Sequence, residues 1–235
     1  YIAGSGLAAE TVLALVDGVA RGCRVHNMTL AGGETAQLPD LYAVGHYDLA
    51  GTILGVVSEG RALHGDGVRV GDSLVGYASS GLHTNGYTLA RRIVFDDLRL
   101  DLDSEPPELG ARLGEILLAV HRSYWAAISP VLDRVHALAH ITGGGIPGNL
   151  ARSLPQGCRA RVKRGSWPVP ELFQWLQQGG RVDAGEMYRV FNMGVGMIAV
   201  AGAEEVPRIQ AAARSAAVDT WVVGEVVAGQ GVEIA

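Results

Sequence analysis

Three glycine-rich stretches follow apolar segments of the chain and could hold a phosphate-bearing ligand. Glycine lets backbone N–H groups approach an anion without interference from a Cβ atom, and hydroxyl side chains add donors. A helix that follows such a loop points its positive end at the anion. Each stretch by itself is more often only a tight turn. The three stretches are Leu30–Thr35 (LAGGET), Ala78–Gly86 (ASSGLHTNG) and His140–Gly145 (HITGGG).

Three titratable side chains lie in or near these stretches. Glu34 lies in a glycine-flanked turn, where a carboxylate could bind Mg²⁺ or orient a substrate, or could cap a helix. Asp48 lies at the start of an expected strand, where the alternative is an ordinary turn aspartate. His83 lies between a strand and a helix and suits a phosphate donor or a general acid or base. Its alternative is a histidine hydrogen-bonded to the loop backbone.

Two further histidines, His136 and His140, are four residues apart in the segment HALAH. On a helix this spacing could bind zinc, but the glutamate of the H-E-x-x-H motif is missing and the segment is typical of a strand. We therefore predict no zinc site from this pair. The chain also lacks the Walker A loop, the Rossmann fingerprint and the Gly-x-Ser-x-Gly elbow.

The elements that must position these residues alternate between strands and helices. This order predicts an α/β (α+β) fold with a mixed sheet and flanking helices. A glycine-rich and charged linker over 58–71 predicts a domain boundary there. Expected helices are 10–21, 86–95, 109–120, 124–134, 169–178 and 204–217; expected strands are 47–57, 73–78, 137–142, 195–200, 221–227 and 231–234.

Composition limits the partners that this chain can have. Of 235 residues, 48% are hydrophobic, enough for a folded core, and 33 are glycine, roughly twice the usual ~7%. A net charge of −5 argues against nucleic acid as a partner. The longest apolar run, Met193–Ala203, has eleven residues, whereas a membrane helix needs about 20. Two distant cysteines and no visible signal peptide predict a cytoplasmic protein.

Several long stretches resemble one enzyme family, aminoimidazole ribonucleotide synthetase (phosphoribosylformylglycinamidine cyclo-ligase) of purine biosynthesis. The resemblance covers nearly the whole chain in order. It departs at Gln37-Leu38, where the family often has Glu-Met, and at Leu82, where it often has Pro. Family members also carry an N-terminal stretch before the residue that matches Tyr1. The matching stretches are Gly32–Pro39, Tyr47–Gly51, Ser79–Tyr87, His140–Gly145, Ser166–Phe173 and Glu186–Met197.

The resemblance implies an ATP-dependent cyclisation that uses Mg²⁺. ATP phosphorylates the formyl amide oxygen of formylglycinamidine ribonucleotide, and the amidine nitrogen then displaces phosphate as the imidazole ring closes. It also implies a cytoplasmic homodimer, built on a barrel formed by paired N-terminal domains. Residues 1–58 would be the C-terminal part of that ATP-binding and dimerisation domain, and residues 59–235 the C-terminal α/β domain.

The same resemblance implies roles for individual residues. Glu34 and His83 would be catalytic, and Glu34 would also bind the metal. Gly32, Gly33, Thr35 and Asp48 would bind the nucleotide cofactor. The ribonucleotide would be bound by Ser79, Ser80, Gly81, Thr84, Asn85, Gly86, Thr142, Gly143, Gly144 and Gly145.

Two other readings remain open at this point. Relatives with similar loops include selenophosphate synthetase, thiamine-monophosphate kinase and formylglycinamide ribonucleotide amidotransferase, which use ATP on other acceptors. A chain that begins at Tyr1 could also be an inactive fragment that binds a phosphate ester.

Overall fold

The computed structural model describes all residues from Tyr1 to Ala235, and the chain divides into two compact units, Tyr1–Arg61 and Ala62–Ala235. The mixed α/β class expected from the sequence is confirmed. No helix combines the length and the apolar character that a membrane crossing requires. Each unit is described by itself below.

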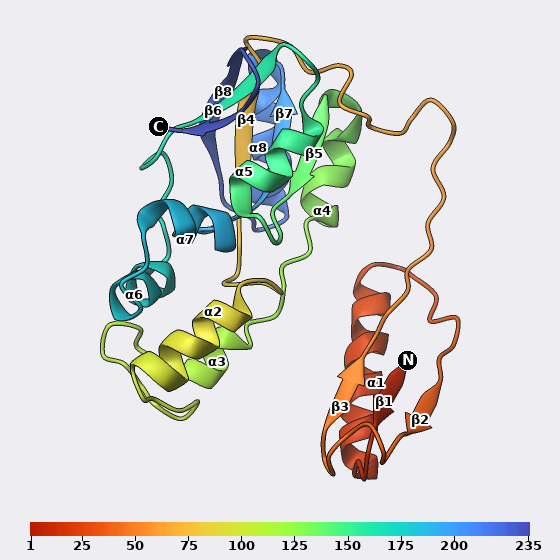
Figure 1. Ribbon diagram of the computed structural model, residues 1–235. Coiled ribbons are helices and arrows are strands. Elements are labelled where there is room, and N and C mark those ends of the chain that lie inside the picture. Colours follow the sequence, from red (N-terminus) through yellow and green to blue (C-terminus); the bar gives the residue numbers. More distant parts are fainter. The chain divides into compact units, whose positions relative to one another are not determined.

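The first unit is a small three-stranded sheet beside one long helix (Figure 1). The central strand β1 (Ile2–Gly4) pairs in parallel with β2 (Thr35–Gln37) and antiparallel with β3 (Tyr47–Leu49). Helix α1 (Ala9–Val25) confirms the helix expected from its apolar spacing. None of its residues is buried within the chain, and its apolar side chains remain accessible.

The second unit is built on a six-stranded mixed sheet with the order β5-β7-β4-β8-β6-β9. Only β6 and β9 pair in parallel; the other neighbours are antiparallel. Helices cover it on both faces, and Figure 1 shows α2 and α3 side by side beyond the end of β4. The strands are β4 (Ser73–Ala78), β5 (Ala137–His140), β6 (Cys158–Val162), β7 (Val195–Ala201), β8 (Thr220–Ala228) and β9 (Gly231–Ile234).

The helices of this unit are short. They are α2 (Tyr87–Arg91), α3 (Leu113–Leu117), α4 (Trp125–Ile128), α5 (Gly145–Leu150), α6 (Glu171–Gly179), α7 (Ala184–Val190) and α8 (Val206–Ser215). A π-helical segment, Arg92–Asp97, continues α2, and 3₁₀ turns lie at Ser129–Arg134, Ala151–Ser153 and Ala203–Glu205.

Alternation along the central strands places apolar side chains on both faces of the sheet. Leu74 joins the larger core cluster, whereas Val75 and Tyr77 join a second cluster that contains residues of α4 and α8. On β7, Ile198 and Val200 belong to the larger cluster and the intervening Ala199 to the second. A strand buried on both faces reads as a continuous apolar run, which explains the eleven-residue stretch in the sequence.

Several expected elements differ in extent from the observed ones. The expected strand 47–57 ends at Leu49 because its neighbour β1 is only three residues long. The expected helix 109–120 is reduced to α3, since Gly110 has a left-handed backbone (φ 65°) that interrupts a helix. The expected helix 124–134 becomes α4 and a 3₁₀ turn that contains Pro130.

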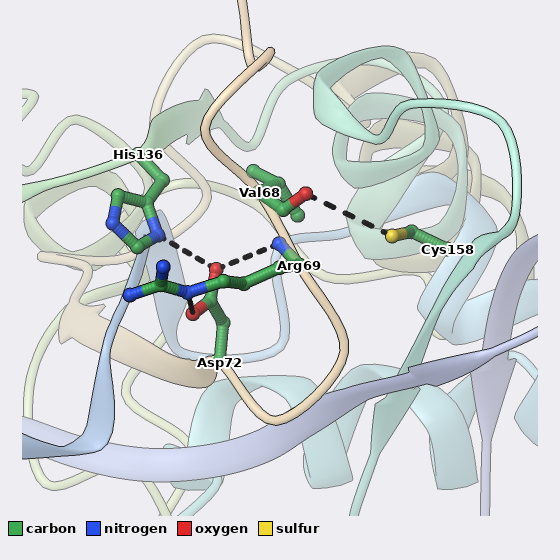
Figure 2. A network of polar contacts seen from close by, with 5 residues as sticks. All are labelled: Val68, Arg69, Asp72, His136 and Cys158. Atoms are coloured by element: carbon green, nitrogen blue, oxygen red, sulfur yellow. Dashed lines mark hydrogen bonds and ion pairs between the residues drawn. The ribbon is translucent and has the colours of Figure 1, made fainter.

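A buried carboxylate organises the turn that leads into β4 (Figure 2). Asp72 is only 1% exposed, and its Oδ2 accepts a hydrogen bond from the Arg69 backbone N–H at 3.0 Å. The same oxygen lies 2.7 Å from Nδ1 of His136. The turn is also held at Val68, whose carbonyl oxygen accepts from the Cys158 thiol at 3.9 Å. His136 is therefore engaged by Asp72, well away from His140 at the other end of β5.

Gly145 is one of the glycines in this unit that tolerate no side chain. Gly145 has φ +60°, and a Cβ atom there would overlap the backbone carbonyl of Tyr188 in α7. Gly148, in the same helix α5, has nothing within 4 Å of the Cβ position. Alanine substitutions at these two glycines therefore give a test and its control within the same helix, one at a closed position and one at an open position.

We expect Gly145→Ala to lower the free energy of unfolding by more than about 2 kcal/mol, because the substitution combines backbone strain with a clash. Gly148→Ala should raise it by about 0.5–1 kcal/mol, since alanine favours a helix. Urea denaturation of both variants measures the difference. Equal stabilities would show that the contact between α5 and α7 is not as close as described.

Candidate functional site

Two of the three glycine-rich loops lie at one end of the six-stranded sheet. Strands β4 and β5 both pair antiparallel with β7, so they run in the same direction and end on the same side. The loop Ser79–Gly86 follows β4, and the loop Ile141–Gly144 follows β5. The Oδ1 atom of Asn85 lies 3.4 Å from where a Cβ atom on Gly143 would stand, which places the loops in contact. The sequence-predicted substrate residues of both loops are thereby brought together.

The loop Ser79–Gly86 is held by the buried amide of Asn192, which is 4% exposed. The Ser79 hydroxyl donates to Asn192 Oδ1 at 2.9 Å, and the Gly194 N–H donates to the same oxygen at 2.8 Å. The Asn192 Nδ2 group donates to the Gly81 carbonyl at 2.8 Å. One side chain thus ties the first residues of this loop, Ser79 and Gly81, to the segment just before β7.

The second loop is organised in the same way by Asn149 of α5. Its Nδ2 group donates to the carbonyl oxygens of Thr142, Gly143 and Gly145, at 3.2, 3.2 and 2.8 Å. Its Oδ1 accepts from the Thr142 hydroxyl at 3.0 Å. The exposed Gly143 and Gly144 have backbone N–H groups that donate to no acceptor in the chain. These groups are available to an anion.

His83 lies in the first loop with a left-handed backbone (φ 61°) and is 4% exposed. Its Nε2 accepts a hydrogen bond from the Ser80 backbone N–H at 3.1 Å. Its carbonyl accepts from the Tyr87 hydroxyl at 3.0 Å. The ring stacks on His121, with centroids 3.9 Å apart.

Burial, with smaller contributions from the neighbouring His121, His140 and Arg122, lowers the pKa of His83 to about 3. Burial also lowers the pKa values of His121 and His140. At neutral pH these imidazoles are uncharged. Because Nε2 of His83 accepts a hydrogen bond, its proton resides on Nδ1, which is buried and has no partner. A general-base role for His83 at neutral pH is therefore disfavoured, and that of a neutral hydrogen-bonding group remains.

The third predicted loop belongs to the first unit. Gly32 and Gly33 are exposed, and a Cβ atom at either would meet nothing within 4 Å. The Glu34 carboxylate is exposed, and its Oε1 accepts from the Thr35 N–H at 2.9 Å. Asp48 accepts from the Tyr42 hydroxyl at 2.9 Å, and this hydrogen bond raises the pKa of Tyr42.

Three residues of the site were not singled out from the sequence. His121 lies in the irregular segment between α3 and α4, where no motif marks it. Asn149 and Asn192 are buried amides in segments rich in glycine, and such amides are expected to satisfy turn backbone. The signal that could have found Asn192 is its place between two apolar runs, where an unpaired amide would be costly.

An open groove of about 780 Å³ adjoins the first loop at Gly86. It runs along α2 and the π-helical segment, and Arg91 and Arg92 line it together with Glu186 of α7. Both arginine side chains are exposed. The groove is separate from the histidines of the loop.

Comparison with known proteins identifies the family to which this site belongs. Residues 69–235 match the family described as AIR synthase related protein, C-terminal domain. A phosphoribosylformylglycinamidine cyclo-ligase of Thermosynechococcus vestitus is 45% identical over 98% of this chain and 68% of its own length. The chain belongs to the phosphoribosylformylglycinamidine cyclo-ligase family.

Further members of the cyclo-ligase family agree with this assignment. The cyclo-ligase of Sorangium cellulosum is 46% identical over 97% of this chain and 66% of its own length. That of Trichlorobacter lovleyi is 42% identical over 96% of the chain and 65% of its own length. The chain therefore spans about two thirds of the length of these curated relatives.

Solved structures share the fold at low sequence identity. Thiamine-monophosphate kinase from Stenotrophomonas maltophilia has a TM-score of 0.67 and 18% identity, covering 99% of this chain and 70% of that one. The hydrogenase maturation protein HypE of E. coli has a TM-score of 0.61 and 21% identity, covering 100% of this chain and 68% of that one. The kinase, an alternative reading from the sequence, is thus related in fold, whereas the cyclo-ligases match in sequence as well.

The Asn192 amide provides a test of the loop geometry. Asn192→Asp keeps the shape but replaces the Nδ2 donor by an oxygen that faces the Gly81 carbonyl. We expect the free energy of unfolding to fall by about 2 kcal/mol or more, because a buried acceptor faces another acceptor. Thermal or urea denaturation measures this loss.

The exposed Asn27 provides the control, because Asn27→Asp should change stability by less than about 0.5 kcal/mol. If Asn192→Asp were as stable as the parent, the amide would not hold the loop in the way described.

Proposed function

We propose that the protein containing this chain closes the imidazole ring of aminoimidazole ribonucleotide, converting formylglycinamidine ribonucleotide with ATP and releasing ADP and phosphate. The observation that carries this proposal is the contact between the loops Ser79–Gly86 and Thr142–Gly145, in a chain of the cyclo-ligase family. The contact brings the polar side chains of the first loop beside the free N–H groups of the second, a combination that suits a phosphate ester.

The second unit contributes binding and positioning to this reaction. The free N–H groups of Gly143 and Gly144 are suited to the ribose phosphate, and Thr142, whose hydroxyl donates to Asn149, would support the loop that carries them. Asn85 and the exposed Thr84 would hold the formylglycinamidine end. Ser80 would contribute as an acceptor, because its hydroxyl donates to the Val120 carbonyl at 2.7 Å. His83 contributes as a neutral imidazole and not as a base. Such groups accelerate ring closure by orientation and by hydrogen bonds to developing charge.

We assign ATP and Mg²⁺ to residues of the first unit. A carboxylate oxygen is a preferred magnesium ligand, and Mg²⁺ commonly uses only one or two carboxylates together with phosphates and water, so exposed Glu34 fits. Gly32 and Gly33 leave open backbone for phosphate, with Thr35 and Asp48 nearby in the same sheet. When bound, Mg²⁺ would neutralise the charge of the transferred phosphoryl group. A solved structure of the same fold, AaThiL, is complexed with AMPPCP and TMP.

We further propose a cytoplasmic homodimer without nucleic-acid or membrane partners. Both cysteines are free thiols, which supports a reducing compartment, and the net charge of −5 supports a small-molecule substrate. The apolar face of α1, which includes Leu13, Val16 and Val19, supports pairing through the first unit.

A panel of acceptors separates the cyclo-ligase from its relatives. We expect ADP release from the full-length protein with formylglycinamidine ribonucleotide, and none above background with thiamine monophosphate or selenide. Coupled ADP detection measures the rates, and a nucleotide-only reaction gives the background. Turnover of thiamine monophosphate alone would assign the protein to the kinase reading, and binding without turnover of any acceptor would favour an inactive binding protein.

Replacement of His83 tests the substrate loop. We expect His83→Ala to reduce kcat by roughly 10²-fold, the usual effect of removing one hydrogen-bonding group from a transition state. The melting temperature reports any accompanying loss of stability, and His64→Ala is the control because His64 is exposed outside both loops. Turnover near that of the parent would remove His83 from the mechanism.

A further inference from the structure

Three histidines from distant parts of the sequence meet in the second unit. His83 comes from the loop after β4, His121 from the segment between α3 and α4, and His140 from the end of β5. One ring nitrogen of each lies within 4.8 Å of the other two. Among the residues of the chain, this is the one group of three or more His, Cys, Asp or Glu side chains with such spacing.

The outer pair of the cluster already has the spacing of zinc ligands. Nε2 of His121 and Nε2 of His140 are 3.2 Å apart. In a tetrahedral zinc site with Zn–N bonds of about 2.0–2.1 Å, neighbouring nitrogens stand roughly 3.4 Å apart. Two imidazole nitrogens that face each other so closely otherwise have to share a single proton.

The third histidine, His83, is more deeply buried than this pair. His83 is 4% exposed, His121 is half-buried and His140 is exposed, so the cluster is open to solvent on the His140 side. His83 can supply a lone pair in two ways: Nε2 exchanges the Ser80 N–H for the metal, or the ring proton leaves Nδ1, which has no hydrogen-bond partner in the chain, and moves to Nε2. A metal ion could therefore enter from solvent on the His140 side and reach ring nitrogens that are partly shielded from water.

The chemistry of the donors selects the class of metal. Imidazole nitrogen suits zinc and similar transition metals, whereas magnesium and calcium prefer oxygen. No carboxylate belongs to the cluster. Burial keeps the three rings in the uncharged form that binds metal, since it lowers the pKa of each.

We propose that His83, His121 and His140 form a binding site for one zinc ion, with the fourth coordination position open to solvent or ligand. The stacked rings of His83 and His121 lie 16° from parallel, so binding requires His121 to tilt. His121 lies in an irregular segment between Leu117 and Trp125, where such a movement breaks no helix or strand. The proposed site goes beyond the cyclo-ligase reaction and does not depend on it.

Zinc binding to the untagged, chelator-treated protein tests the proposal by calorimetry at neutral pH. We expect one zinc ion per chain and a rise in melting temperature on zinc addition. His121→Ala should weaken binding at least tenfold, because two histidines remain. Cobalt(II), used as a spectroscopic substitute, should give the visible absorption of a four-coordinate site in the parent and lose it in the variant.

A second variant separates zinc coordination from a merely structural histidine pair. The asparagine amide of the His121→Asn variant can still donate a hydrogen bond to His140, but an amide is a poor zinc ligand. We therefore expect this variant to fold like the parent protein and to bind zinc at least tenfold more weakly. His64→Ala should bind zinc like the parent. The proposal is overturned if the parent binds no zinc, or if both His121 variants keep its affinity and stoichiometry.

Discussion

The hydrogen bonds of the buried Asn192 side chain are the constraint on which the candidate site depends. They join the turn after β4 to the start of β7, and β7 is also the neighbour of β5. Both loops of the site are therefore placed relative to the same buried strand. Since a buried amide that loses a partner is costly, this junction has few alternative arrangements.

The second loop repeats this solution with Asn149 instead of Asn192. In each case an amide satisfies backbone carbonyls at the bottom of a glycine-rich turn and leaves the upper backbone accessible. This division explains how the same loops can be rigid and still present free N–H groups.

Much of the fold could be predicted from the sequence because its strands are apolar and bounded by glycine. β4 and β9 were predicted with their observed bounds, and β7 from its continuous apolar run. β6 was not predicted, although its alternation of apolar residues with Arg159 and Arg161 is typical of a half-exposed strand. α7 was not predicted either, although Asp183 caps it and Glu186 follows three residues later.

The loops of the site were predicted, but their supports were not. Glycine clusters are visible in a sequence, whereas the contact between Asn85 and Gly143 depends on the strand order of the sheet. The histidine cluster illustrates the same limit, because its members are 38 and 19 residues apart along the chain. The neighbouring pair His136 and His140, in contrast, is separated by the length of β5, and His136 is bound to Asp72.

The exposure of α1 has a consequence for the dynamics of this chain. A helix without a buried residue gains little from tertiary packing, and most helical stability in proteins comes from such packing. In the chain by itself, before any partner covers α1, its amide protons should therefore exchange with deuterated solvent long before those of β4 and β7, which are covered on both faces. The first compact unit would then open more readily than the second, and pairing through α1 would slow that opening.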